Sequence, residues 1–250
     1  MRLHRFYISP KNLDHLVFEQ EIALNYDEFG TLLHQWRDVF RYKTGDRVYV
    51  FNEQIGEWLL EFISIDKKHG AVLKTIEQEK VASVSKPHRD ITLYMSVIKN
   101  SNFDLVVEKT TELGVTRIVP VKTERTIKSN LNFERLNRIA IEATEQSGRI
   151  APPVIDEVAS LETAIHNALD NQGQKNVYFG HISSEKGSQS EEAKEGGSKP
   201  VAVFIGPEGG WTDQEVDLFL GSGILPIALG QFVLRAETAA ITSMAIFGGY

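Results

Sequence analysis

The period of the apolar and polar residues changes along the chain. Residues 1–76 favour β-structure, because the segments 47–51 and 57–63 are rich in β-branched and aromatic side chains with partial two-residue alternation. One helix is expected among these strands, where an apolar stripe at helical spacing is formed by Leu32, Leu33, Trp36, Val39 and Phe40. Several short strands with one helix predict a small β-barrel.

From residue 90 onward, strand patterns alternate with helix patterns, which is typical of a mostly parallel sheet. The expected strands are 91–98, 115–121, 176–179, 201–205 and 227–229. The expected helices include 133–147, 161–169 and 239–247. A further helix is expected to begin at Ser101-x-x-Asp104, which has the spacing of a capping box. Gly114 is expected to end that helix in the left-handed conformation. The predicted fold class is therefore α/β.

Two polar stretches divide this pattern. Residues 77–89 contain Pro87 and are interpreted as a linker, which predicts a first domain over 1–76 and a second over 90–250. Residues 183–199 hold no apolar side chain except Ala193 and are expected to form a flexible loop.

Composition and charge narrow the function classes. The 250 residues carry a formal net charge of -7, which excludes a uniformly basic nucleic-acid coat. The charge is uneven, because residues 86–149 hold 11 basic and 8 acidic side chains while residues 150–250 hold 5 and 13. A segment of +3 is common by chance, so charge alone favours no polyanion partner.

The absence of cysteine excludes disulfides, thiolate metal sites and a thiol nucleophile. No signal peptide or membrane span is evident, and a cytoplasmic protein is expected.

Candidate chemistry lies in two glycine-containing loops that follow predicted strands. The first is Ile205-Gly-Pro-Glu-Gly-Gly210, between the apolar strand 201–205 and a helix that Thr212 and Glu215 would cap. Glycine pairs allow close approach of a ligand to the backbone, and open α/β sheets bind ligands beyond the carboxyl ends of their strands. A tight turn with a solvated Glu208 is an equally good interpretation from these residues alone. The second loop is 229–238, where Arg235 and Glu237 could also be a surface ion pair.

Several well-known sites are missing from the sequence. There is no G-x-G-x-x-G after a strand, no phosphate-binding G-x-x-x-x-G-K-[ST], no H-E-x-x-H and no G-x-S-x-G. The histidines show no tight metal-ligand spacing, so no metal site is predicted.

The motifs together resemble one family over essentially the whole chain. They are Arg5-Phe-Tyr, Glu108-Lys-x-Thr-Glu-Leu-Gly-Val115, Glu124-Arg125, Glu142-Ala-x-Glu-Gln-Ser-Gly-Arg149 with Pro152–Pro153, Gly206-Pro-Glu-Gly-Gly210 and Leu229-Gly-x-x-Val-Leu-Arg-x-Glu-Thr-Ala239. In this order they resemble the RsmE family of 16S ribosomal RNA methyltransferases, within the SPOUT superfamily. The resemblance implies a PUA-like β-barrel that recognises RNA, followed by a parallel-sheet SPOUT domain tied in a trefoil knot, which pattern alone does not suggest.

The resemblance also implies an enzyme that works as a homodimer without a membrane. It would methylate N3 of one uridine in small-subunit ribosomal RNA, free or in the assembled subunit, from S-adenosylmethionine (SAM). The cofactor-binding residues implied are Ile205, Gly206, Pro207, Glu208, Gly209, Gly210, Leu229, Gly230, Val233, Leu234, Arg235, Glu237 and Thr238.

Methyl transfer to N3 requires loss of the N3 proton, which a carboxylate could accept while a guanidinium stabilises the uridine anion. Glu208 and Arg235 are the candidates for these roles. The candidate RNA contacts are Arg2, Arg5, Lys99, Arg125 and Arg149, since a guanidinium binds phosphate through two hydrogen bonds. Arg2 and Arg5 could instead be solvated residues of the N-terminus.

Other functions stay open at this point. A SPOUT enzyme with a different RNA target is one, and an RNA-binding or ribosome-assembly factor without turnover is another. The sequence departs from the family in the long polar loop 183–199, in Trp211 where Phe or Leu is more usual, and in the turn Asn52–Glu53.

Overall fold

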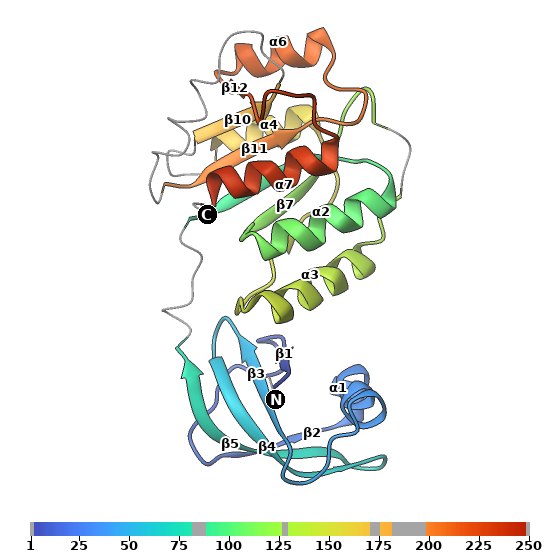
Figure 1. The fold of residues 1–250 in the computed structure, drawn as a ribbon, viewed down its shortest axis with the longest axis vertical. Helices are drawn as coiled ribbons and strands as arrows, with labels where there is room; N and C mark the ends of the chain where they lie inside the picture. Colours follow the sequence, from blue (N-terminus) through green and yellow to red (C-terminus); the bar gives the residue numbers. More distant parts are fainter. Residues whose placement is uncertain (1–2, 82–88, 127–129, 171–175, 182–198, 249–250) are drawn as a thin grey trace. The chain divides into compact units, whose positions relative to one another are not determined.

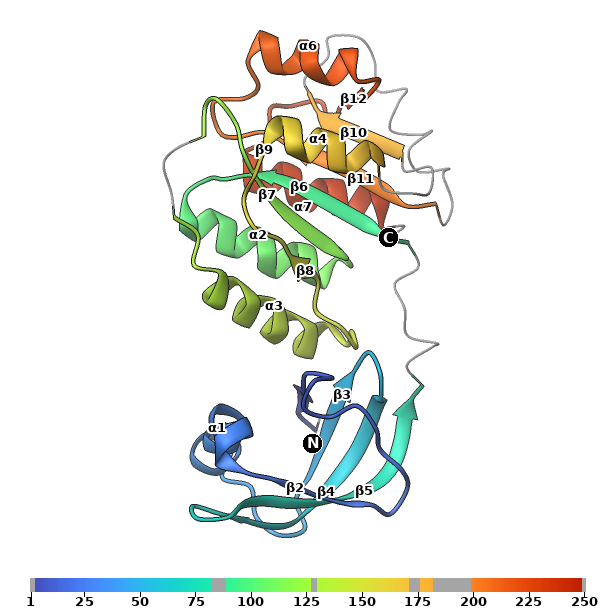
Figure 2. The ribbon, with the colours of Figure 1, turned by 180° about the vertical axis from the view of Figure 1, so that it is seen from behind.

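The chain folds into two units, each of which we describe by itself (Figures 1 and 2). A computed structural model describes residues 3–81, 89–126, 130–170, 176–181 and 199–248. Unit 1 comprises residues 1–86 together with 144–151, and unit 2 comprises residues 87–143 and 152–250.

Unit 1 contains a five-stranded sheet in the order β1-β3-β4-β5-β2. Its strands are β1 (Arg5–Tyr7), β2 (Glu21–Leu24), β3 (Arg47–Asn52), β4 (Gly56–Asp66) and β5 (Gly70–Lys80). β1 and β3 run parallel, whereas the other neighbours are antiparallel. Register shifts between β4 and β5 mark β-bulges, which bend a pair of strands. Among the described strands no ladder joins β1 to β2, so these ladders alone do not test the predicted small β-barrel.

One helix in unit 1 covers the predicted apolar stripe but begins earlier. α1 (Tyr26–His34) starts where the Asn25 side chain accepts a hydrogen bond from the Glu28 N–H. It continues into a π-helical turn, η1 (Gln35–Val39). Leu33 and Trp36 are fully buried, but Val39 is 70% exposed. A π-helical turn has hydrogen bonds between residues i and i+5, and this rotates Val39 around the helix axis. Val39 therefore lies outside the buried face to which a regular α-helix would assign it.

Aromatic side chains fill the core of unit 1. The ring of Trp36 meets Phe6 at 5.4 Å and Phe62 at 5.1 Å between centroids, both edge to face. Asn52 is fully buried and serves the chain around it, because its Nδ2 donates to the carbonyls of Ile8 and Leu13 while its Oδ1 accepts from the N–H of Gln54 and Ile55. The Asn52–Glu53 turn is thus fixed by side-chain hydrogen bonds.

The boundary predicted between the domains is wrong by several residues. β5 continues to Lys80, which pairs with Glu57, so residues 77–80 belong to a strand and not to a linker. Residues 144–151 also group with unit 1, although they follow residue 90. Arg89, predicted to end the linker, is 6% exposed, and its Nη1 donates to the Phe247 carbonyl. Residues 82–88 lie outside the described part of the chain.

Unit 2 contains a parallel sheet in the order β12-β10-β11-β6-β7-β8, with β9 also paired to β7. This confirms the predicted α/β class with a parallel sheet. The strands are β6 (Ile91–Ser96), β7 (Arg117–Lys122), β8 (Val154–Ile155), β9 (Ala159–Ser160), β10 (Asn176–Gly180), β11 (Val201–Ile205) and β12 (Leu225–Ile227). The helices are α2 (Asn100–Glu112), α3 (Phe133–Ser147), α4 (Leu161–Asp170), α6 (Asp213–Gly221) and α7 (Ala236–Phe247).

Helices cover both faces of this sheet (Figures 1 and 2). On one face, α2, α7 and the first part of α3 pack against Leu93, Met95 and Val203. On the other face, α4 and α6 pack against Tyr94 and Phe204, whose rings stack at 4.3 Å. Because both faces are covered, the central strands β6 and β11 are buried at every position, as expected for a parallel sheet between two helix layers.

Several predicted boundaries in unit 2 differ from the structure, among them the starts of α2, β12 and α7. α2 begins at Asn100 with Lys99 as its N-cap and no side-chain cap, so Ser101 does not open the helix. β12 covers 225–227 and not 227–229, with Pro226 accepted because the strand is at the edge of the sheet. α7 begins at Ala236, three residues before the predicted start, with the extended Arg235 as its N-cap residue. Gly114 has the predicted positive φ, 87°.

A flexible loop and the lack of a membrane span were also predicted from the composition of the chain. The predicted loop 183–199 lies outside the described residues except for Lys199. Within the described ranges, none of the helices combines the length and apolar character needed to cross a membrane.

Candidate functional site

A cavity of about 440 Å³ opens where β10, β11 and β12 end. Since these neighbouring strands are parallel, their carboxyl ends meet at one edge of the sheet. The loops that follow them form the wall, together with the start of α7. The lining residues are Gly180, His181, Ile205–Pro207, Glu208, Gly210, Trp211, Ile227–Gly230, Phe232–Ala236 and Ala239.

The loop between β11 and α6 is held from several directions. Gly210 has φ of 68°, which makes a glycine the suitable residue there. Arg125 Nη1 donates to the carbonyls of Gly209, at 2.7 Å, and Trp211, at 3.2 Å. The stem of Arg125 also lies over Gly209, where an added Cβ would come within 3.2 Å of Arg125 Cδ. The loop is therefore ordered by a side chain from a distant part of the sequence.

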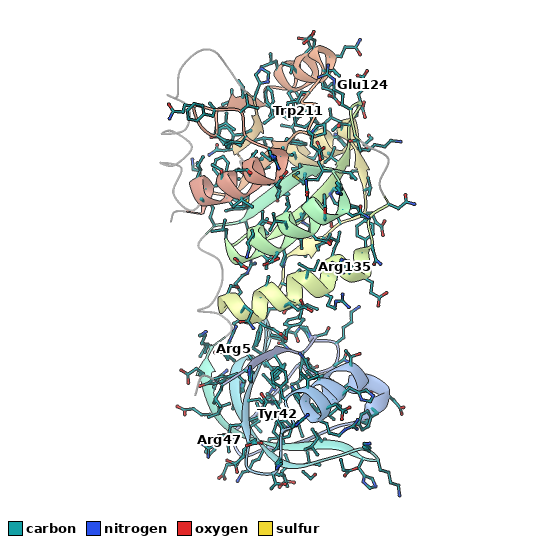
Figure 3. All side chains as sticks on the ribbon, turned by 45° about the vertical axis from the view of Figure 1, so that its right-hand side comes forward. Arg5, Tyr42, Arg47, Glu124, Arg135 and Trp211 are labelled. Atoms are coloured by element: carbon teal, nitrogen blue, oxygen red, sulfur yellow. The ribbon has the colours of Figure 1, made fainter. Side chains whose placement is uncertain are left out.

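The predicted capping box fixes the end of this loop. Thr212 Oγ1 accepts a hydrogen bond from the Glu215 N–H, and Glu215 Oε2 accepts one from the Thr212 N–H. The second oxygen of Glu215 accepts from the Glu124 N–H at 2.9 Å. Glu215 is 8% exposed, so its carboxylate acts inside the fold and joins the loop to the chain after β7. Figure 3 shows Glu124 and Trp211 in unit 2.

Two charged side chains on the cavity wall are exposed. Glu208 comes from the loop after β11, and Arg235 is the N-cap residue of α7. Neither forms an ion pair with another residue in the described part of the chain. A carboxylate and a guanidinium that face a cavity without being paired are available to a ligand, one to accept a proton and the other to stabilise negative charge.

The rest of the wall suits a ligand with an apolar, flat part. Ile227, Leu229 and Leu234 contribute apolar side chains, and Gly206 offers bare backbone. Phe232 and Val233 are 75% and 76% exposed. A cavity with mostly apolar lining and a few polar groups is typical of small-molecule and cofactor sites.

The cavity brings together most of the predicted cofactor-binding residues. Ten of them line it: Ile205, Gly206, Pro207, Glu208, Gly210, Leu229, Gly230, Val233, Leu234 and Arg235. Gly209, Glu237 and Thr238 do not. Gly209 lies under Arg125, and Glu237 is 9% exposed within the first turn of α7, with Oε2 lacking a hydrogen-bond partner in the described part of the chain.

Sequence reasoning missed the third strand end. Gly180 and His181 line the cavity from the end of β10, and Trp211 lines it from the loop after β11. The sequence does not reveal that Gly180 lines the cavity, because this depends on the sheet order, which places β10 beside β11. Trp211 was noted in the sequence as a departure from the family but was not assigned to the site.

The candidate RNA contact Arg5 has a different place. Its Nε pairs with Glu57 Oε2 at 2.5 Å, and the two side chains are 9% and 4% exposed. Its Nη1 donates to the carbonyls of Thr144 and Glu145, and its Nη2 donates to that of Arg149. The guanidinium also lies 4.2 Å from the Phe51 ring centre. Every nitrogen of the guanidinium takes part in a hydrogen bond within unit 1, where Figure 3 shows Arg5, so the contacts that the structure gives this side chain are structural.

The other four candidate RNA contacts are placed as follows. Arg2 lies outside the described residues. Lys99 is exposed at the start of α2, and Arg149 is half-buried in unit 1. Arg125 is exposed but has Nη1 bound to the loop after β11.

The described residues contain no group of three or more histidine, aspartate or glutamate side chains that could hold a metal ion. Burial raises the pKa of Tyr94 to about 12, so this phenol is not a base near neutral pH. Among the described residues that line the cavity, the carboxylate of Glu208 and the imidazole of His181 are the side chains able to accept a proton.

Comparisons with known proteins place the chain among RNA methyltransferases. The model of the "RNA methyltransferase domain" family matches residues 85–248. The ribosomal RNA small subunit methyltransferase E of Rickettsia conorii is 30% identical over 98% of this chain and 95% of its own. The protein of the same name from Synechocystis is 30% identical over 97% of this chain and 76% of its own.

Two solved structures extend the likeness to the whole fold. A Legionella pneumophila protein solved in complex with the cofactor SAM has a TM-score of 0.82 and 26% identity, with 99% of this chain and 97% of that chain covered. The ribosomal RNA small subunit methyltransferase E of Neisseria gonorrhoeae, bound to S-adenosyl methionine, has a TM-score of 0.80 and 25% identity, with 98% and 96% covered. The family model matches most of the chain, and a relative of the same kind aligns with nearly all of it. This protein therefore belongs to the RNA methyltransferase family.

Proposed function

We propose that this protein transfers a methyl group from SAM to N3 of a specific uridine in small-subunit ribosomal RNA. The observation that carries the proposal is the cavity at the ends of β10, β11 and β12, with Glu208 and Arg235 exposed on its wall. Relatives named for this kind of enzyme align with nearly the whole chain, and two similar structures were solved with SAM.

The cavity suits SAM in size and lining. Ile227, Leu229 and Leu234 offer apolar contact for an adenine ring, while Gly206 and Gly210 leave the backbone open to polar groups of the ligand. When bound, SAM supplies an electrophilic methyl group on sulfur. The protein must then hold the target base so that N3 faces that methyl group.

Glu208 and Arg235 carry the chemistry in this proposal. Glu208 accepts the proton from uridine N3, which makes N3 nucleophilic, and Arg235 stabilises the negative charge that develops on the base. N3 gains the methyl carbon as the carbon–sulfur bond breaks, and the electron pair of that bond stays on sulfur. No cysteine exists in the chain to activate the pyrimidine covalently.

The finer features of the fold belong to the same proposal. We propose that unit 1 is a PUA-like RNA-recognition domain and that unit 2 is a SPOUT domain with a trefoil knot. We further propose a homodimer, in which a second copy covers part of the exposed apolar surface near Leu225, Phe232 and Val233. Sedimentation equilibrium should then give twice the mass of 28.1 kDa.

RNA contact by two of the candidate basic residues belongs to the same proposal. Lys99, the N-cap residue of α2, is an exposed candidate of unit 2, and Arg149 is a half-buried candidate of unit 1. Their replacement by Ala should weaken RNA binding and lower its dependence on salt, because fewer phosphates are neutralised.

The direct test uses purified protein, SAM with a labelled methyl group and small-subunit ribosomal RNA, both free and in assembled subunits. The RNA is digested and the labelled nucleoside is identified and mapped. We expect 3-methyluridine at one position. Label in another nucleoside, or only in transfer RNA, would indicate a different RNA target, and SAM binding without transfer to any RNA would indicate a binding protein without turnover.

A further inference from the structure

We propose that Trp211 is a positioning residue of the cofactor cavity, whose indole fastens the end of β10 to the loop after β11. This inference rests on the proposed function, because it assumes that the cavity holds SAM. It assigns to Trp211 an effect on the affinity for SAM, which the residue exerts through the shape of the cavity. Three contacts carry it, one through the indole N–H, one through the ring and one through the backbone.

The first contact is a hydrogen bond between two strand-end loops. Trp211 Nε1 donates to the Gly180 carbonyl at 2.9 Å (Figure 3 shows Trp211). Gly180 is the last residue of β10, and both residues line the cavity. The bond therefore ties two parts of the wall that are 31 positions apart in the sequence.

The second contact fixes the plane of the ring. A Cβ added at Gly206 would come within 3.0 Å of Trp211 Cε2 and 3.3 Å of its Cδ2 and Nε1. On the side of the sheet core, the Trp211 ring meets Phe219 of α6 edge to face, with centroids 4.8 Å apart. The indole is thus held between the backbone of the cavity wall and the core, and Gly206 provides the room it needs.

The third contact fixes the backbone that carries the ring. The Trp211 carbonyl accepts a hydrogen bond from Arg125 Nη1, and the next residue, Thr212, begins the capping box of α6. Since both sides of the residue are anchored, the indole N–H stays directed at Gly180. A Phe at this position could keep the ring packing, but it has no N–H to donate.

These contacts predict an effect on cofactor binding more than on the rate of the bound complex. The loops after β10 and β11 both line the cavity, so a link that holds them together reduces the ordering that ligand binding requires. Glu208 and Arg235 do not contact Trp211 by any hydrogen bond between described residues. Breaking the link should therefore raise the Kd for SAM and leave kcat at saturating SAM nearly unchanged.

The chain offers a matched control for this hydrogen bond. Trp58 Nε1 donates to the Ile55 carbonyl at 2.8 Å, in unit 1. Trp58→Phe removes the same kind of bond away from the cavity. By calorimetric titration with SAM, we expect Trp211→Phe to raise the Kd about 2- to 12-fold, the range of a typical net hydrogen bond, with kcat within about twofold. Trp211→Leu should raise the Kd for SAM further, and Trp58→Phe should leave this Kd unchanged.

A spectroscopic test uses the same tryptophans. The chain has three, so Trp36→Phe with Trp58→Phe leaves Trp211 as the single one. Trp36 Nε1 has no hydrogen-bond partner in the described part of the chain, so Phe removes no bond there. We expect a saturable change in Trp211 emission on titration with SAM or S-adenosylhomocysteine, with the Kd measured by calorimetry.

The outcomes separate this inference from the proposed function. If the wild-type protein binds no SAM, the proposed function fails. If the wild-type protein binds SAM but Trp211→Phe and Trp58→Phe bind it equally well, only the role of Trp211 is overturned. A loss of kcat without a change in Kd would overturn it as well. If Trp211→Phe does not fold, the single-tryptophan protein still decides, because an emission unchanged by saturating SAM contradicts the inference.

Discussion

Unit 1 and the cavity of unit 2 use arginine and glutamate in opposite ways. In unit 1, Arg5 and Glu57 are buried as a pair, and the guanidinium also bonds three backbone carbonyls. In the cavity wall of unit 2, Arg235 and Glu208 are exposed, and neither is ion-paired within the described residues. A charged group whose hydrogen bonds are all used holds the fold together, whereas an unpaired one at a cavity is available for chemistry.

The same contrast applies to glycine. Gly70 in unit 1 has φ of 91°, which suits the tight turn between β4 and β5, and a Cβ there would lie 2.0 Å from the carbonyl oxygen of Leu24 at the end of β2. Gly206 in unit 2 makes room for the Trp211 indole. The first glycine is required by the backbone, and the second by the wall of the cavity. The predictions below test this division between structural and functional residues.

The largest expected effect is on catalysis. Glu208→Gln and Arg235→Ala should each lower the single-turnover rate of methyl transfer, by about 10²- to 10⁴-fold for the proposed base Glu208. Because both side chains are exposed, the free energy of unfolding should change little. The rates are measured with labelled SAM and ribosomal RNA, and Asp217→Asn on α6 serves as a charge control away from the cavity lining. Rates near wild type in both variants would remove these two residues from the mechanism.

The next effect is on stability. Arg5→Ala removes the closer of the two ion-pair partners that the buried Glu57 carboxylate has among the described residues, the other being Lys80 at 3.3 Å, so we expect a loss of about 1–3 kcal/mol in the free energy of unfolding of unit 1. Arg47→Ala is the control, since the Arg47–Glu61 pair is 49% and 35% exposed and should contribute about 0.2–1 kcal/mol. Chemical denaturation measures both. A stable Arg5→Ala protein with weakened RNA binding would support Arg5 as an RNA contact.

A smaller effect is expected at Arg125. Arg125→Ala removes the hydrogen bonds to the Gly209 and Trp211 carbonyls, which should loosen the loop and raise the Kd for SAM about 2- to 10-fold. Arg135→Ala is the control, because Arg135 pairs with Asp104 in unit 2 and does not line the cavity. If the affinity for RNA falls in Arg125→Ala while the Kd for SAM stays the same, its role is RNA contact as predicted from the sequence.

The elements that depend on local patterns were predictable from the sequence. The helix 133–147 was predicted with its exact ends, because a clear apolar stripe is followed by Gly148, which has φ of 86°. The capping box of Thr212 and Glu215 is confirmed, whereas the similar spacing at Ser101 and Asp104 is not a cap. An aspartate is one methylene shorter than glutamate, and Asp104 pairs with Arg135 instead.

The features that depend on tertiary structure were not predictable. The two loops after β11 and β12 were found because each carries glycines, but the contribution of Gly180 requires the knowledge that β10 lies between β11 and β12. The burial of Arg5 depends on carbonyls of residues 144–149, far away in the sequence. The position of an arginine within a motif does not reveal whether its partners are inside the protein or outside it.

The central claim is that the cavity at the ends of β10, β11 and β12 holds SAM, and calorimetric titration of a matched glycine pair tests it most directly. Gly206→Ala places a methyl group 3.0 Å from the Trp211 ring, while Gly221→Ala on α6 meets nothing within 4 Å. We predict one SAM per chain for the wild type and for Gly221→Ala, and affinity at least about 5-fold weaker for Gly206→Ala, as expected for overpacking. Equal affinity in Gly206→Ala and the wild type, or no binding by the wild type, would contradict the account.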